Sequence, residues 1–256
     1  MIVRIALVKA YPTKGDLDAN HAQLMAILGE VADHTADVVV TPEGFLDGYI
    51  STEEYVTREN IARYAIDPMN SPYVSGVANW ASRHRAWFIL GCARATTAGV
   101  YNSALILDRV GQTVGIYDKT HCLSHDKKYL PGQGLPVFSS DFGPFGVMIC
   151  ADRRWPETVR ALALQGARVI FNPTYGFHDS KNLCMMRTRS YESEAFIAFT
   201  HPAQSLITGP GSQIVLNETS EDVSFAVSEI DLTEVDRVRS GANSHLSNRR
   251  PDIYVR

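Results

Sequence analysis

Short apolar runs alternate with amphipathic stretches along this chain. Apolar segments rich in β-branched residues are typical of strands, and they occur at 2–10, 37–43, 87–93, 145–150 and 167–174. Between Leu24 and Val31 the apolar residues recur at helical spacing, which predicts a helix over 18–36. Two further helices are predicted over 72–84 and 156–166.

Hairpins and a late helix complete the pattern. The segment 101–119 is interpreted as two antiparallel strands joined at a turn that contains Gly111. A helix that runs directly into a strand is predicted over 182–201, and the segments 212–217 and 223–232 are interpreted as a final strand pair. Strands that alternate with helices and hairpins indicate mixed sheets packed against helices.

The chain shows no repeat, no low-complexity linker and no domain boundary. We therefore predict one domain over 1–256, with a polar, extended C-terminal arm over 241–256. The net charge of the whole chain, −4, argues against nucleic acid or an anionic membrane as a partner. No apolar run reaches the roughly 20 residues of a membrane helix, and the N-terminus resembles a strand more than a signal peptide. We expect a cytoplasmic protein.

The four cysteines are far apart and form no CxxC pair, so free thiols are expected rather than a disulfide framework or a zinc site. His125-Asp126 and His178-Asp179 resemble metal ligands, but no third ligand stands at useful spacing. We expect no metal and no cofactor.

Three predicted strands end in ionisable residues. Glu43 follows "VVVTP", Lys119 follows "VGIYD" and Cys150 follows "GVMI". Because ligands bind at the carboxyl ends of strands in open α/β sheets, these side chains can form one site with Cys150 as nucleophile and Glu43 as general base. Lys119 and the backbone N–H of Ala151 can then bind an oxyanion. Taken singly, each has a plainer interpretation: a buried thiol, a solvated loop acid and an edge-strand lysine.

Four sequence motifs are distributed over nearly the whole chain, in the order "TPEGFLDGY", "YDKTH…YLPGQG", "GVMICADRRWPE" and "RRPDIY". Together they resemble the nitrilase superfamily of carbon–nitrogen hydrolases. The resemblance implies a four-layer α–β–β–α sandwich with two mixed β-sheets, at least a homodimer, and no metal or organic cofactor. It implies Glu43 as general base, Lys119 as transition-state stabiliser and Cys150 as nucleophile. Arg189 and Glu192 also match the family, with a structural role in packing or in pairing subunits.

The nucleophile motif "CADRRWPE" is closest to that of the N-carbamoyl-D-amino-acid hydrolases, in which paired arginines help to bind the substrate carboxylate. Arg153 and Arg154 offer the same forked donors. The alternative is that they pair with Asp152, Glu157 or another subunit. Nitrilases, amidases and carbamoylases share the three catalytic residues, so the resemblance leaves the substrate open.

This sequence departs from the family pattern beside Lys119. The family commonly has a second glutamate six positions before the proline of "PG", and counting back from Pro131 leads to His125, with Asp126 next to it. Either residue can take over part of that role. Ala151 replaces a larger residue, which implies a pocket of altered shape. His121 matches a family histidine and is expected to order the loop or the pocket wall, while Asn172, Tyr175 and Phe177 line the pocket or only pack the loop.

The leading hypothesis is a thiol amidohydrolase that acts on a small amide or ureido substrate, such as an N-carbamoyl amino acid or another carboxylate-bearing compound. The first alternative is an amidase for a simple amide or a dicarboxylic-acid monoamide. An alternative of another class is a catalytically silent relative that serves as a binding module.

Overall fold

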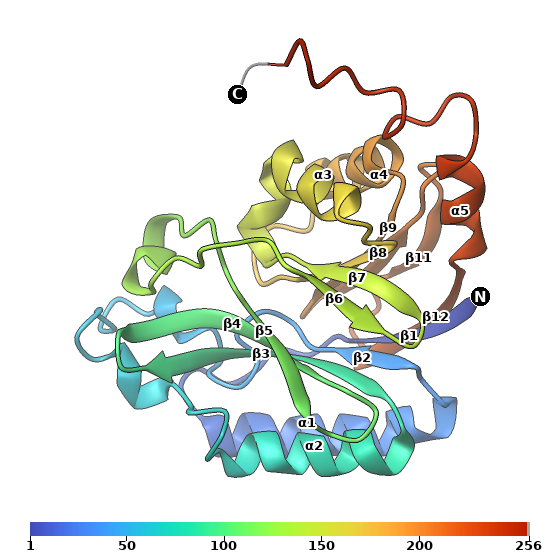
Figure 1. The fold of residues 1–256 in the computed structure, drawn as a ribbon. Helices are drawn as coiled ribbons and strands as arrows, with labels where there is room; N and C mark the ends of the chain where they lie inside the picture. The colour runs from blue at the N-terminus through green and yellow to red at the C-terminus, as the bar shows by residue number, and fades with distance from the viewer. Residues whose placement is uncertain (255–256) are drawn as a thin grey trace.

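The computed structural model describes residues 1–254 and contains two six-stranded sheets (Figure 1). The first sheet has the strand order β12-β1-β2-β3-β4-β5. Its strands are β1 (Ile2–Val8), β2 (Val38–Val40), β3 (Trp87–Thr96), β4 (Gly99–Leu107), β5 (Thr113–Asp118) and β12 (Phe225–Asp231). The sheet is mixed, because β1, β2 and β3 are parallel to one another and the remaining neighbours pair antiparallel.

The second sheet has the order β11-β10-β9-β8-β7-β6 and is also mixed. Its strands are β6 (Val137–Ser140), β7 (Gly143–Val147), β8 (Val169–Pro173), β9 (Phe196–His201), β10 (Gln204–Thr208) and β11 (Ile214–Glu218). Here β7, β8 and β9 form the parallel centre.

Helices cover the outer faces of both sheets (Figure 1). The helices are α1 (Leu17–Val31), α2 (Pro72–His84), α3 (Pro156–Leu164), α4 (Ser180–Ser193) and α5 (Thr233–Arg239). One apolar core lies between the sheets, a second joins the first sheet to α1 and α2, and a third joins the second sheet to α3 and α4. The layers therefore run α–β–β–α, as the resemblance implied. Among the described residues, none of the helices is both long and apolar enough to cross a membrane.

Local signals explain where several elements begin. Asp16 caps α1 by accepting the Ala19 N–H at 2.9 Å, and Ser71 precedes α2, whose first residue is Pro72. The hairpin between β4 and β5 turns at Gly111, which has a φ of +79°. All three residues of β2 are buried, as expected for a parallel strand covered on both faces.

The predicted final strand pair is wrong. The two segments are strands, but β11 pairs with β10 in the second sheet and β12 pairs with β1 in the first. Each apolar pattern is satisfied by a neighbour that local sequence does not specify. The strands β6 and β10 were not predicted, and the strand before Cys150 ends at Val147, so Cys150 begins a 3₁₀ turn over Cys150–Arg154.

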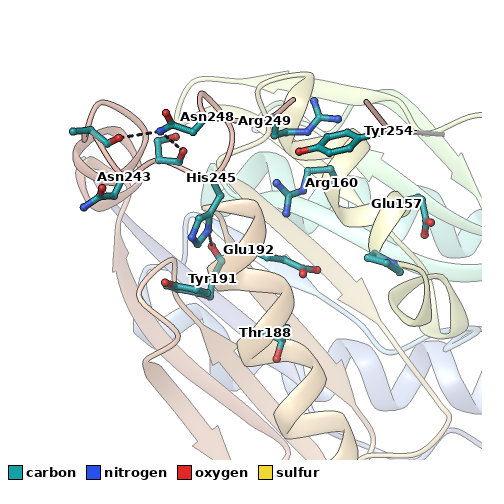
Figure 2. Close-up of a pocket in the computed structure, with 13 residues that line it drawn as sticks. Glu157, Arg160, Thr188, Tyr191, Glu192, Asn243, His245, Asn248, Arg249 and Tyr254 are labelled. Atoms are coloured by element: carbon teal, nitrogen blue, oxygen red, sulfur yellow. Dashed lines mark hydrogen bonds between the residues drawn. The ribbon is translucent and has the colours of Figure 1, made fainter. Parts of the chain in front are cut away.

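The C-terminal arm lies beside α3 and α4, where Ser244 Oγ donates to Glu194 Oε2 at 2.8 Å. A pocket of about 920 Å³ lies between the arm and these two helices, and Figure 2 draws the residues that line it. Arg160, Tyr191 and Glu192 are among its lining residues, and none of Glu43, Lys119 and Cys150 lines it. The last two positions of the predicted arm, 255–256, lie outside the described residues.

Candidate active site

Glu43 lies just beyond β2 and is completely buried. Its Oε1 accepts hydrogen bonds from Lys119 Nζ at 2.7 Å and from Asn102 Nδ2 at 2.9 Å. Its Oε2 accepts the backbone N–H of Tyr175 at 3.0 Å. Because these donors come from both sheets, the carboxylate is held in one orientation at the junction between them.

Lys119 follows β5 and bridges two carboxylates. Besides Glu43, its Nζ donates to Asp126 Oδ2 at 2.5 Å, and the Lys119 side chain is fully buried. Burial alone would lower the pKa of this ammonium, but the charges of Glu43, Cys150 and Asp126 more than offset it, so the pKa lies above its ordinary value. Lys119 is therefore a permanent cation at neutral pH.

Of the two candidates for the missing glutamate, Asp126 contacts Lys119. His125 instead lies with its Nε2 2.9 Å from the Tyr49 hydroxyl, and its side chain is 40% exposed. The same hydroxyl donates to Asp126 Oδ1 at 2.9 Å. Both residues belong to the 3₁₀ turn Ser124–Lys128, in which Asp126 is the buried member.

Cys150 begins the turn after β7 with a left-handed φ of +45°. A non-glycine residue in this region stores backbone strain, which is typical of functional turns. The residue is 8% exposed. Burial, and after it the charge of Glu43, raises the pKa of the Cys150 thiol, whereas Lys119 and Arg153 act in the opposite direction. Of these charged groups, Arg153 has its Nη1 atom 3.5 Å from Cys150 Sγ.

The turn is held by Asp152, a completely buried carboxylate. Its Oδ2 accepts from the Tyr117 hydroxyl at 2.7 Å and from the Ile149 N–H at 2.8 Å. Its Oδ1 accepts the His121 N–H at 3.0 Å and lies 2.7 Å from Nδ1 of that ring, which stacks on Trp155 at 4.1 Å. Burial would raise the pKa of Asp152, but the hydrogen bonds from His121 and Tyr117 bring it below the ordinary value. His121 therefore lies against the turn that begins at Cys150 and contacts its buried carboxylate.

The adjacent arginines occupy different environments. Arg153 is fully buried and donates to Asn182 Oδ1 at 2.8 Å, to Phe177 O at 2.7 Å and to Cys150 O at 2.6 Å. Arg154 is exposed, with its guanidinium carbon 5.2 Å from the centre of the Phe177 ring. Arg153 and Arg154 therefore do not form one joint fork.

Two predicted pocket residues contribute through different groups. Asn172 is buried and donates from Nδ2 to Met148 O at 3.0 Å, so it supports the segment before Cys150. Tyr175 contributes its backbone N–H to Glu43, and its ring lies 5.1 Å from that of Tyr49. Ala151 follows Cys150 in the same turn.

Sequence reasoning missed three contributors, Lys14, Tyr49 and Asn102. Lys14 Nζ lies 4.4 Å from the centre of the Tyr175 ring and donates to Thr52 Oγ1 at 2.7 Å. Tyr49 is part of the motif "TPEGFLDGY" and Asn102 begins a predicted strand, so both had a usable signal. Lys14 stands in an unpatterned loop and had none.

Arg189 and Glu192 form an ion pair on α4 at 2.8 Å. Arg189 also donates to the carbonyl oxygens of Arg153 at 3.3 Å and Arg154 at 3.1 Å. These bonds connect α4 to the turn Cys150–Arg154, which is a packing contact within the chain. Across residues 1–254, no three histidine, cysteine or carboxylate side chains gather as a metal site.

Comparison with known proteins shows which family this chain belongs to. The family model for carbon–nitrogen hydrolases matches residues 4–240. A nitrilase of Pyrococcus abyssi is 29% identical in an alignment that spans 100% of both chains. An N-carbamoylputrescine amidase of Arabidopsis thaliana is 27% identical and covers 93% of this chain and 90% of its own.

Solved structures agree in fold. A Saccharomyces cerevisiae protein of the nitrilase superfamily superposes with a TM-score of 0.84 at 20% identity, covering 99% of this chain and 97% of its own. An amidase from Nesterenkonia sp. gives a TM-score of 0.79 at 20% identity, with coverages of 98% and 94%. Because the family model matches residues 4–240 of the chain, this chain belongs to the carbon–nitrogen hydrolases of the nitrilase superfamily and is a hydrolase of C–N bonds other than peptide bonds.

Proposed function

We propose that this hydrolase is a thiol amidohydrolase with Cys150 as nucleophile, Glu43 as proton carrier and Lys119 as electrostatic stabiliser. The observation that carries the proposal is the fully buried Lys119–Glu43 ion pair, which acts on the pKa of a thiol held on a strained turn. A buried pair of this kind is costly to fold around, and perturbed groups that cluster around a nucleophile are typical of active sites.

In the first half-reaction the Glu43 carboxylate accepts the Sγ proton, and the sulfur attacks the carbonyl carbon of the amide or ureido group. The carbonyl π electrons move to oxygen, and this oxyanion accepts hydrogen bonds from Lys119 and the Ala151 N–H. One such donor is typically worth about 3 kcal/mol. The tetrahedral intermediate collapses as the C–N bond breaks, and Glu43 returns its proton to the departing nitrogen.

In the second half-reaction Glu43 accepts a proton from water, and the resulting hydroxide attacks the thioester carbon. The C–S bond then breaks, the carboxylic acid leaves, and the proton on Glu43 returns to the sulfur. An N-carbamoyl amino acid would release the amino acid first, and the carbamoyl group would leave as carbon dioxide and ammonia.

The charges near the cysteine favour a carboxylate-bearing substrate. The Arg154 guanidinium lies over the Phe177 ring and Lys14 Nζ lies over the Tyr175 ring. Both rings belong to the loop after β8. Glu43 and Asp126 are already paired with Lys119, and the charges of Glu53 and Asp47 act on Lys14. Two cations suit an anionic group better than the amine of N-carbamoylputrescine. An N-carbamoyl amino acid and a dicarboxylic-acid monoamide both satisfy this requirement.

Initial rates of ammonia release test the substrate class. The panel contains both hands of N-carbamoyl amino acids, dicarboxylic-acid monoamides, N-carbamoylputrescine, neutral amides and nitriles. We expect carboxylate-bearing compounds to give the highest kcat/KM, and Arg154→Ala to lower it about tenfold for them relative to their neutral counterparts, since a hydrogen bond to a charged group contributes about 1.5–3 kcal/mol. Arg154→Lys retains the charge and is the matched control. A preference for neutral or cationic substrates would refute this assignment.

A further inference from the structure

Arg153 is the largest fully buried side chain among the described residues. A guanidinium stays charged at any pH that a protein tolerates, and burying a charge is costly unless an opposite charge compensates it. Arg153 nevertheless forms no ion pair with a carboxylate within residues 1–254; its acceptors at Asn182, Phe177 and Cys150 O are neutral oxygens. The charge is therefore hydrogen-bonded without being neutralised.

The group next to this cation that can become negative is the cysteine sulfur. Arg153 Nη1 lies 3.5 Å from Cys150 Sγ, within hydrogen-bonding distance for sulfur. The guanidinium carbon lies 4.3 Å from the centre of the Phe177 ring and 5.5 Å from that of Phe199, so the planar group is also fixed by aromatic neighbours. Its position is set before any substrate arrives.

We propose that Arg153 is a further catalytic residue of this site, whose guanidinium stabilises the negative charge on Cys150 Sγ instead of binding the substrate carboxylate. The inference rests on the proposed role of Cys150 as nucleophile. When Glu43 takes the Sγ proton, the electron pair left on sulfur is stabilised by both Lys119 and Arg153. The charge passes to the carbonyl oxygen as the C–S bond forms, and it returns to sulfur when that bond breaks in the second half-reaction.

This division of labour explains why the two neighbouring arginines differ in burial. Arg153 has its donors engaged by the protein around the sulfur, whereas Arg154 is exposed and can meet an incoming carboxylate. The charged and titratable groups that act together with the thiol are Glu43, Lys119, Tyr49 and Arg153. The negative charge of Glu43 disfavours the thiolate, so an Arg153 variant without the guanidinium retains Lys119 as the one cation in this group.

The test is the pH dependence of Cys150 alkylation by iodoacetamide, a neutral reagent that needs no substrate carboxylate. The full-length chain carries Cys184→Ser because Cys184 is exposed. Burial raises the pKa of Cys122 to about 12 and that of Cys92 well above its ordinary value, so both react slowly. Peptide mapping by mass spectrometry gives the rate at Cys150 from pH 6 to pH 10.

An opposite charge at this distance shifts a pKa by about 1–3 units. Arg153→Met is therefore expected to slow alkylation by about tenfold or more at pH 7 and to raise the apparent thiol pKa, so that the difference shrinks only above the pKa of the parent. Arg153→Gln provides a second neutral variant that retains polar contacts if the Met variant does not fold. Arg153→Lys, which retains the charge, should stay within about threefold of the parent, as should Arg160→Met on α3.

Each outcome decides the question. A folded neutral variant with the parent's alkylation rates would overturn the proposal, and so would a slowing that leaves the apparent thiol pKa unchanged or a Lys variant as slow as the neutral ones, because these indicate packing alone. Alkylation that depends on Arg153 in a protein that hydrolyses no substrate would sustain this inference while refuting the proposed reaction. Hydrolysis without such dependence would do the reverse.

Discussion

Replacing Asp126 with asparagine tests whether Lys119 needs two carboxylates. Lys119 Nζ lies 2.7 Å from Glu43 Oε1 and 2.5 Å from Asp126 Oδ2, while the other oxygen of Asp126 accepts the Tyr49 hydroxyl at 2.9 Å. Asparagine has nearly the same shape, but it has one oxygen and cannot accept from both Lys119 and Tyr49. The substitution therefore removes one charge and the charged acceptor of at least one buried hydrogen bond.

A hydrogen bond to a charged group contributes about 1.5–3 kcal/mol. We expect Asp126→Asn to lower the free energy of unfolding by about that amount. If Lys119 positioning is lost to the same extent, kcat/KM falls about 10- to 100-fold, since about 1.4 kcal/mol corresponds to a factor of ten. Urea denaturation at pH 7.5 measures the first quantity, and ammonia release from the best substrate of the panel measures the second.

His125→Asn is the matched control, because His125 contacts Tyr49 and not Lys119. It should change kcat/KM by less than about threefold, as expected for the loss of one partly exposed hydrogen bond. Full activity in the Asp126 variant, or an equal loss in both variants, would contradict the hypothesis that Asp126, rather than His125, takes over the role of the family's second glutamate.

Two further predictions concern the supports of the site. A Cβ at Gly91 would lie 2.3 Å from Pro42 O, whereas one at Gly29 would meet no atom within 4 Å. Gly91→Ala should therefore destabilise the chain by about 1–3 kcal/mol and reduce kcat by displacing Glu43, while Gly29→Ala in α1 should stabilise the chain by about 0.5–1 kcal/mol. Urea denaturation measures the stability of both variants, and ammonia release measures their kcat. Burial, and after it His178, lowers the pKa of His201 from 6.5 to about 4, so between these values the unfolded chain binds a proton that the folded chain does not. Stability should be complete above pH 6.5 and fall toward pH 4, and His201→Gln should flatten this dependence; an unchanged slope would contradict the assignment.

Three candidate residues of the site were identified from the positions at which apolar segments of the sequence end. The runs before Glu43, Lys119 and Cys150 are β2, β5 and β7, and the two sheets bring their ends together. For β2 and β7 this placement follows from parallel pairing, because the carboxyl end of a parallel strand has a fixed place in the fold, whereas β5 is an antiparallel edge strand.

Other features depend on contacts between distant segments. Counting along the chain led to His125, with Asp126 next to it, and the contact of Asp126 with Lys119 depends on the turn Ser124–Lys128 together with the Tyr49 hydroxyl. The pairing of β12 with β1 joins the two ends of the chain, which no local pattern specifies. Lys14 gave no signal because its role depends on the ring of Tyr175 in another layer.

The central claim is that Cys150 carries the reaction, and ammonia release by the full-length protein, Cys150→Ala and Cys184→Ala tests it most directly. Cys184 is the exposed thiol and serves as the matched control. We predict that the parent and Cys184→Ala hydrolyse at least one carboxylate-bearing amide or ureide at equal rates, and that Cys150→Ala is slower by about 10³-fold or more. Equal rates for Cys150→Ala and the parent, or no hydrolysis of any compound in the panel by the parent, would contradict the account.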